Sequence, residues 1–140
     1  MTTSVNGGCL CGAVRYAAIG PVRALTLCHC ASCRRAAGAP SLAWAVFPAD
    51  SVRFTAGAPT MFASSPGVVR GFCGACGTSL TYQGTTRPDL IDVTTASLDD
   101  PNAFAPTKEI WVGDKLAWEA LNPSIAHYAA SSVGATPIAD

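Results

Sequence analysis

Two short stretches decide the fold of this chain: Gly7-Gly-Cys-Leu-Cys-Gly12 and Cys73-Gly-Ala-Cys-Gly77. Each places two cysteines one or two residues apart, a spacing at which one turn of backbone can present two thiolates to a tetrahedral ion. The flanking glycines let the backbone curl so that amide groups point at the sulfurs. Together the two pairs supply a closed set of four ligands, and we expect them to bind a structural Zn²⁺ that pins the sheet. Buried cysteines without metal are the alternative. The four residues are Cys9, Cys11, Cys73 and Cys76.

The other three cysteines lie close together, in Cys28-His-Cys-Ala-Ser-Cys33. Because Cys28, Cys30 and Cys33 have no fourth cysteine, a Zn²⁺ bound to them would keep one position for water or an incoming ligand. Three thiolates leave such a site with a net negative charge, which suits it to a soft ligand such as a substrate thiolate, or to polarising a small carbonyl. We predict a catalytic-type site here. The alternative is a second structural Zn²⁺ with a fourth ligand from elsewhere.

Two histidines and two arginines could also take part in this site, and the sequence predicts a position or a role for each. In an extended Cys-x-Cys segment the side chain of His29 points away from its neighbours, so we expect it behind the ligands or at the surface rather than on the metal. His127 is expected to pack or to face solvent. Arg34 and Arg35 follow Cys33 directly, and their guanidinium groups are candidates for binding the carboxylates of an anionic co-substrate. Solvated charge at a helix end is the alternative for this pair.

Composition limits the class of protein. With 140 residues, 49% of them hydrophobic and 13% charged, we expect one domain over residues 1–140 with its core at about 5–130. Nine basic and nine acidic residues cancel, so we expect no nucleic-acid partner. The longest apolar run, Leu42–Phe47, is too short for a membrane span, and the first residues lack the features of a signal peptide. We therefore expect a cytoplasmic protein with reduced thiols and no membrane partner.

Short β-type runs alternate with turns rich in Gly, Pro and Asp, which predicts a mainly β fold of mostly antiparallel sheets whose loops carry the cysteines. The expected strands are Ala13–Ile19, Ala24–Leu27, Leu42–Phe47, Val52–Thr55, Thr60–Ala63, Val68–Phe72, Ser79–Tyr82, Leu90–Ala96 and Glu109–Val112.

Helix signals are few. Ala31–Ala37 is expected to form a short helix that Gly38 ends, and Ala117–Leu121 and Ser124–Tyr128 are weaker candidates. Residues 1–8 are expected to form a flexible lead and residues 131–140 a loose tail. The three tryptophans are expected in the core, although one could line a pocket. They are Trp44, Trp111 and Trp118.

Four stretches of the chain resemble the glutathione-dependent formaldehyde-activating enzyme family, which also includes centromere protein V. They are Gly-Gly-Cys-Leu-Cys-Gly-Ala-Val-Arg-Tyr (7–16), Cys-His-Cys-Ala-Ser-Cys-Arg-Arg-Ala-Ala-Gly (28–38), Ser-Ser-Pro-Gly-Val-Val-Arg-Gly-Phe-Cys-Gly-Ala-Cys-Gly-Thr-Ser-Leu (64–80) and Ser-Leu-Asp-Asp-Pro (97–101). The resemblance runs in order from about Gly7 to Trp118. One position departs from it: Glu109 precedes Ile110, where many members carry a histidine.

The resemblance implies an Mss4-like fold, β-sheets pinned by zinc, with the closed set as the structural site and the triplet as a second, catalytic-type site. The activity it implies is addition of glutathione to formaldehyde, and the family is classed with the carbon–sulfur lyases. The sequence therefore predicts a zinc-dependent carbon–sulfur lyase-type enzyme. Its partners would be a small-molecule thiol, such as glutathione as co-substrate, and a small aldehyde. The alternative is a non-catalytic zinc-binding module for metal sensing or protein interaction.

Overall fold

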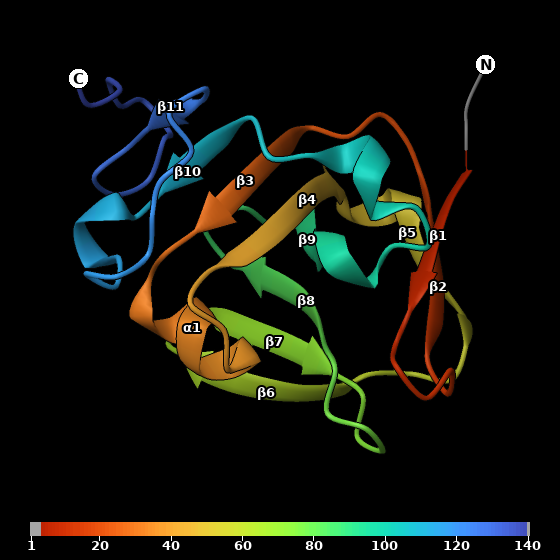
Figure 1. Cartoon of the computed structure of the whole chain (residues 1–140). Coiled ribbons are helices and arrows are strands. Elements are labelled where there is room, and N and C mark those ends of the chain that lie inside the picture. Colours follow the sequence, from red (N-terminus) through yellow and green to blue (C-terminus); the bar gives the residue numbers. More distant parts are fainter. Residues whose placement is uncertain (1–3, 140) are drawn as a thin grey trace.

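Two β-sheets and one short α-helix make up the part of the chain that this computed structural model describes, residues 4–139 (Figure 1). The smaller sheet has the strand order β1-β2-β5, and the larger has the order β11-β10-β3-β4-β9-β8-β7-β6. The strands are β1 (Ser4–Gly8), β2 (Arg15–Ile19), β3 (Ala24–Cys28), β4 (Leu42–Pro48), β5 (Val52–Ala56), β6 (Thr60–Ser65), β7 (Val68–Phe72), β8 (Ser79–Gly84), β9 (Leu90–Thr94), β10 (Lys108–Ile110) and β11 (Ala126–His127). The predicted mainly β fold is confirmed.

Helical structure is short and lies between strands. The α-helix α1 (Ala31–Ala37) has the predicted bounds, and Gly38 ends it in the left-handed conformation with φ 63°. Four 3₁₀ turns are η1 (Ala49–Ser51), η2 (Thr95–Ser97), η3 (Pro101–Phe104) and η4 (Val112–Asp114). Most strand pairs are antiparallel as expected, but β10 runs parallel to both β3 and β11.

The main core lies between the two sheets. Tyr16 of β2 comes from the smaller sheet, and Phe47 of β4, Leu80 of β8 and Val93 of β9 come from the larger one, all with at most 1% exposure. Burying such side chains contributes roughly 1.5–3 kcal/mol each. A second, smaller cluster forms around Trp44 at the other end of β4, and it contains cysteines.

Three sequence expectations are corrected. Residues 4–8 form strand β1, because their backbone pairs with β2 from Ser4↔Ile19 to Gly8↔Arg15; residues 1–3 of the expected lead lie outside the described residues, as does Asp140 of the expected tail. The segments expected to be helical near residues 117–121 and 124–128 contain turns and the strand β11 instead. Trp44 is buried, but Trp111 and Trp118 are 38% and 73% exposed.

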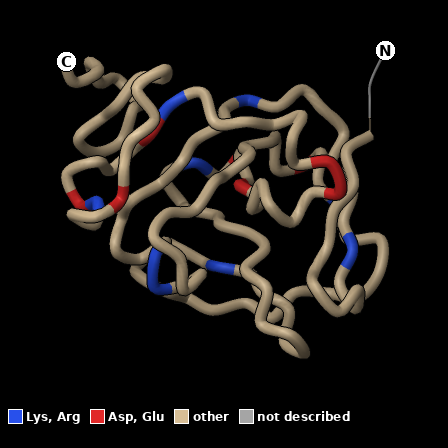
Figure 2. The backbone as a smooth tube through the Cα atoms, in the orientation of Figure 1, with Lys and Arg blue, Asp and Glu red and all other residues tan. Residues whose placement is uncertain are grey.

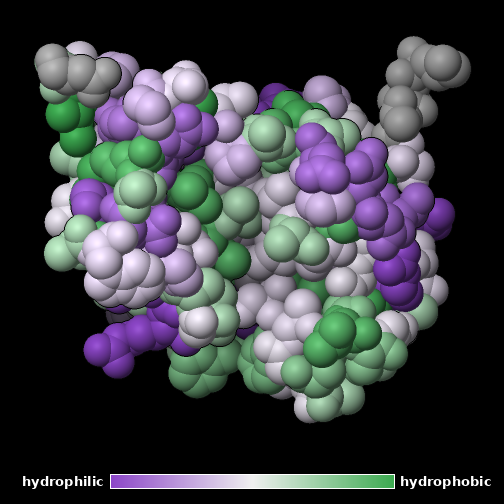
Figure 3. All heavy atoms as spheres, viewed as in Figure 1, coloured by the Kyte–Doolittle hydropathy of each residue, from purple (hydrophilic) through white to green (hydrophobic). Residues whose placement is uncertain are grey.

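Charged residues of both signs are mixed along the chain (Figure 2), and hydropathy is mixed over the one face that Figure 3 shows. Figure 2 shows Lys and Arg spread along the chain among Asp and Glu, with basic segments on α1 and on β7. Figure 3 shows hydrophobic residues scattered between hydrophilic ones on the same face. No helix among residues 4–139 combines the length and the apolar character that crossing a membrane would require.

Candidate metal centres

The first cysteine cluster joins two turns that belong to different sheets. The turn between β1 and β2 carries Cys9 and Cys11, and the turn between β7 and β8 carries Cys73 and Cys76. All four sulfurs lie within 4.8 Å of one another; Cys9–Cys11 measures 3.6 Å and Cys11–Cys73 3.8 Å. A tetrahedral Zn²⁺ with Zn–S bonds of about 2.3 Å needs sulfurs about 3.8 Å apart. The donor set therefore fits a closed zinc site.

Hydrogen bonds to two of these sulfurs, those of Cys9 and Cys76, favour the thiolate form that a metal requires, whereas hydrogen bonds with Cys9 and Cys76 help to raise the pKa of Cys11 to about 11. The Val14 amide donates to Cys9 Sγ at 3.2 Å, and this bond holds the pKa of Cys9 below its ordinary value. Thr78 Oγ1 lies 3.2 Å from Cys76 Sγ and, with its own backbone N–H, lowers the pKa of Cys76 to about 5. Thr78 Oγ1 also accepts the Leu10 N–H at 3.0 Å. Sequence reasoning missed Thr78, which links the two turns directly.

The second cluster forms where β3 meets α1. Cys28 is the last residue of β3, Cys30 caps α1, and Cys33 lies in the first turn of that helix. Their three sulfurs also lie within 4.8 Å of one another, and no further Cys, His, Asp or Glu of residues 4–139 joins the group. Hydrogen bonds with Cys28 and then Cys33 lower the pKa of Cys30. The set could hold a metal ion with one coordination position left for another ligand.

A cation lies beside this triplet. The Arg70 guanidinium comes from β7, and its Nη1 and Nη2 are 3.8 and 3.7 Å from Cys33 Sγ. Its central carbon lies 5.0 Å from the centroid of the Tyr82 ring, a cation–π distance, and Tyr82 packs against Trp44 at 6.0 Å between ring centroids. Arg70 lies in the stretch 64–80, but no local sequence pattern assigns it to the triplet, because 37 positions separate it from Cys33 in the chain.

The two arginines that the sequence singled out lie on α1. Arg34 Nε donates to the backbone carbonyl oxygen of His29 at 3.2 Å, and Arg35 is exposed. Neither is among the residues hydrogen-bonded to a cysteine sulfur. Their binding of a co-substrate stays a prediction.

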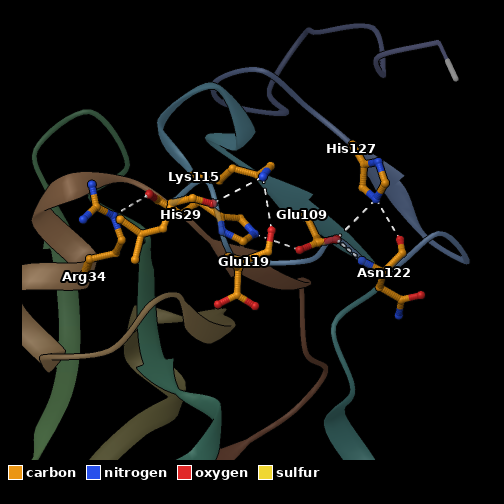
Figure 4. Close-up of polar contacts among 8 residues, drawn as sticks. His29, Arg34, Glu109, Lys115, Glu119, Asn122 and His127 are labelled. Atoms are coloured by element: carbon orange, nitrogen blue, oxygen red, sulfur yellow. Dashed lines mark hydrogen bonds and ion pairs between the residues drawn. The ribbon is translucent and has the colours of Figure 1, made fainter.

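Behind the triplet lies a buried network of polar side chains, shown in Figure 4. His29 and Glu109 are both fully buried, with His29 Nε2 2.7 Å from Glu109 Oε1. The second carboxylate oxygen accepts the Asn122 backbone N–H at 2.7 Å and lies 3.2 Å from His127 Nε2. Strand pairing also places Glu109 close to the triplet, because the next residue of β10, Ile110, is in register with Cys28 of β3. The network therefore supports the segment that carries the triplet, and His29 lies behind the ligands rather than at the surface.

A cavity of about 460 Å³ opens between α1 and the strands β6 to β8. Arg70 and Trp44 line it, and both also contact the triplet cluster. Among the residues that line it, Ala36 belongs to α1 and Gly77 directly follows Cys76. The cavity thus lies next to the triplet and close to the closed set.

Comparison with known proteins agrees with this arrangement. The model of the family described as glutathione-dependent formaldehyde-activating enzyme matches residues 4–114. A crystal structure of a Rhodobacter sphaeroides protein superposes with a TM-score of 0.57 at 25% identity, covering 67% of this chain and 87% of that one. No protein of curated function matches significantly. Because the family model spans most of the chain and includes both cysteine clusters, this protein belongs to the glutathione-dependent formaldehyde-activating enzyme family.

Proposed function

We propose that the protein is a zinc-dependent carbon–sulfur lyase-type enzyme acting on the adduct of a thiol and a small aldehyde. S-hydroxymethylglutathione, from glutathione and formaldehyde, or a related adduct, is the substrate class. The observation that carries this proposal is the contrast between a closed set of four sulfurs and a set of three that stands beside a cavity and a guanidinium group. A non-catalytic zinc module would need no cavity at that place.

The reaction makes and breaks one carbon–sulfur bond without a change of redox state. In the lyase direction the adduct hydroxyl loses its proton, its carbon becomes a carbonyl, and the C–S electron pair stays on the thiol sulfur, which takes up a proton. A Zn²⁺ at Cys28, Cys30 and Cys33 would keep a substrate sulfur ionised near neutral pH. Addition in the reverse direction benefits from holding the two reactants side by side.

The chain's own residues would limit the charge at this site. Three cysteine thiolates and one substrate thiolate exceed the charge of a divalent ion, so an added cation stabilises the loaded site. The Arg70 N–H groups point at Cys33 Sγ and provide that cation. Trp44 covers the same cluster with an apolar side chain and is itself buried, which keeps water away from one side. These contacts support thiol binding at the triplet.

Formaldehyde reacts quickly with thiols in water, which leaves little for a catalyst to improve. We therefore expect a slower aldehyde, or a more persistent adduct, to show the larger enhancement over the uncatalysed rate.

Magnetisation-exchange NMR on pre-equilibrated thiol–aldehyde mixtures tests the proposal, because it measures adduct formation and cleavage at equilibrium. The zinc-loaded wild type should accelerate exchange for at least one thiol–aldehyde pair, glutathione with formaldehyde among those tried. Cys30→Ser should lose this acceleration while keeping the zinc of the closed set, as elemental mass spectrometry would check. Equal exchange rates in wild type and Cys30→Ser for every pair would contradict the proposal.

A further inference from the structure

We propose that the cavity between α1 and β6–β8 is a subsite for a small thiol that carries one carboxylate on an apolar body, with Arg70 as the carboxylate anchor. This inference rests on the proposed function, because it takes the sulfur of the same molecule to be held at the Cys28, Cys30 and Cys33 triplet. It goes further by naming the chemical class of the thiol.

The walls of the cavity are mostly apolar. Its large side chains are Trp44 from β4, Phe62 from β6 and Phe72 from β7, and its polar groups are Arg70, Ser79 and Thr81. A volume of about 460 Å³ falls in the range of small-molecule sites, roughly 300–1,000 Å³. Phe62 is 61% exposed although it lines this cavity, so a ligand with an apolar body would cover it.

Arg70 is a cation without a carboxylate partner among the described residues. The Arg70 Nε atom is buried and has no hydrogen-bond partner in the part of the chain that the structure describes, and the contacts of Nη1 and Nη2 with Cys33 Sγ are long, at 3.8 and 3.7 Å. Arg87 provides an internal contrast: it also lies over the Tyr82 ring, at 5.7 Å, but it is paired with Asp92 at 2.8 Å. A guanidinium binds carboxylates through its planar fork, so Arg70, which contacts a cysteine sulfur but no carboxylate among the described residues, is the group suited to an anionic ligand.

The short path from Arg70 to the triplet limits the size of the ligand. Because the guanidinium nitrogens lie less than 4 Å from Cys33 Sγ, a molecule whose sulfur and carboxylate are a few bonds apart reaches both groups. Thr81 Oγ1 lines the same cavity and is buried without a hydrogen-bond partner among residues 4–139. Within that described range no acidic side chain lines the cavity, and Arg70 is the one cation that does. Within the proposed substrate class, a related adduct therefore fits this cavity better than the glutathione adduct, because the ammonium group and second carboxylate of glutathione find no partner among the residues that line it.

Titration calorimetry on the zinc-loaded protein tests this with 2-benzyl-3-sulfanylpropanoate, whose sulfur is three bonds from its carboxylate carbon, the matching amide, and glutathione. We expect the carboxylate probe to bind at least about tenfold more tightly than its amide and more tightly than glutathione, since a charge-assisted carboxylate pair contributes on that order. Arg70→Gln should abolish the preference for the carboxylate, and Arg70→Lys should retain part of it. Arg53→Gln, which removes an exposed arginine of β5, serves as the matched control and should leave the preference unchanged.

Because Arg70 contacts Cys33, its replacement can also affect the metal. Binding of the thiol-free 2-benzylpropanoate needs no metal, so a loss of its binding in Arg70→Gln but not in Arg53→Gln supports the subsite whatever the metal content. An equal affinity of wild type for the carboxylate probe and its amide would overturn it, as would a preference lost in Arg35→Gln and kept in Arg70→Gln. If the preference depends on Arg70 but no adduct exchange is catalysed, the subsite stands and the proposed function fails. If adduct exchange is catalysed but the protein shows no preference for the carboxylate, the proposed function stands and the subsite fails.

Discussion

Glu109 is a carboxylate with no exposed surface, and its two oxygens are fully engaged by neighbours. His29 Nε2 lies at 2.7 Å from one oxygen, and the Asn122 N–H and His127 Nε2 lie at 2.7 and 3.2 Å from the other. A buried charge is tolerated only with such partners, and its removal leaves them unpaired. Glu109 therefore holds together three segments of the chain: the β3–α1 junction, β10 and the C-terminal part around residues 122–127.

Replacing Glu109 tests how much this network stabilises the fold. We expect Glu109→Ala to lower the free energy of unfolding by about 3 kcal/mol, because it leaves buried donors on His29 and Asn122 without an acceptor. Glu109→Gln keeps the shape and one acceptor, so its cost should be smaller. Urea unfolding with zinc in excess measures both. Asp89→Ala, which removes an exposed carboxylate, is the control and should stay within about 0.5 kcal/mol. A Glu109→Ala protein as stable as this control would contradict a structural role for the network.

At the scale of elements, Tyr16 ties strand β2 to the turn η2. Its hydroxyl lies 2.6 Å from Ser97 Oγ, and the side chain is 1% exposed. Burial raises the pKa of Tyr16 to about 12, above its ordinary 10. Because folding favours the neutral phenol, this contribution to stability is complete below pH 10 and is lost as pH rises towards 12.

The alkaline stability profile should therefore depend on Tyr16. By pH 11 the unfolding free energy of wild type should have fallen by about 1.4 kcal/mol more than that of Tyr16→Phe, relative to pH 8. Chemical unfolding of both proteins at pH 8, 10 and 11 measures this difference, and the comparison cancels other titrating groups. Parallel profiles would mean that Tyr16 ionises in the folded protein at its ordinary pKa.

Local signals explain which elements could be predicted. Helix α1 was found because Gly38 marks its end, and most strands of the larger sheet were found from their apolar residues. Strand β1 was missed because Ser-Val-Asn-Gly-Gly shows no alternation; its position depends on pairing with β2. Strand β10 ends at Ile110, before the predicted Val112, because Trp111 turns into the left-handed region with φ 57°.

The residues of the candidate site also fall into those that a local sequence pattern could predict and those that it could not. Cysteine spacing predicted the two pairs and the triplet, because residues one to three positions apart can reach one metal ion. The two pairs, with Cys11 and Cys73 separated by 62 positions, were joined into one site only because together they supply four ligands. Arg70 and Glu109 act across pairings of strands far apart in the chain, so no local pattern could assign them. The sequence favoured Arg34 and Arg35 as the anion-binding residues instead, because they directly follow Cys33.

At the scale of the whole molecule, the closed set of cysteines lies where the two sheets meet, with ligands from a turn of each. Zinc binding at structural sites contributes on the order of 10–16 kcal/mol, which is comparable to or larger than the roughly 5–15 kcal/mol stability of a domain. Losing a ligand there should therefore prevent folding, whereas losing one from the triplet, at one end of β3 beside a helix of seven residues, should be tolerated.

We accordingly expect Cys76→Ser to be insoluble or unfolded, and Cys30→Ser to be folded with one zinc fewer than wild type. Elemental mass spectrometry on protein purified without chelator gives the metal content per chain, and near-ultraviolet circular dichroism reports the packing of the buried Trp44 and Tyr16. About two zinc ions in wild type and one in a folded Cys30→Ser would establish that the sites are separate. If both variants unfold alike, the triplet is also structural. A folded, metal-free triplet in wild type would instead favour reactive thiols, since hydrogen bonds with Cys28 and Cys33 already lower the pKa of Cys30.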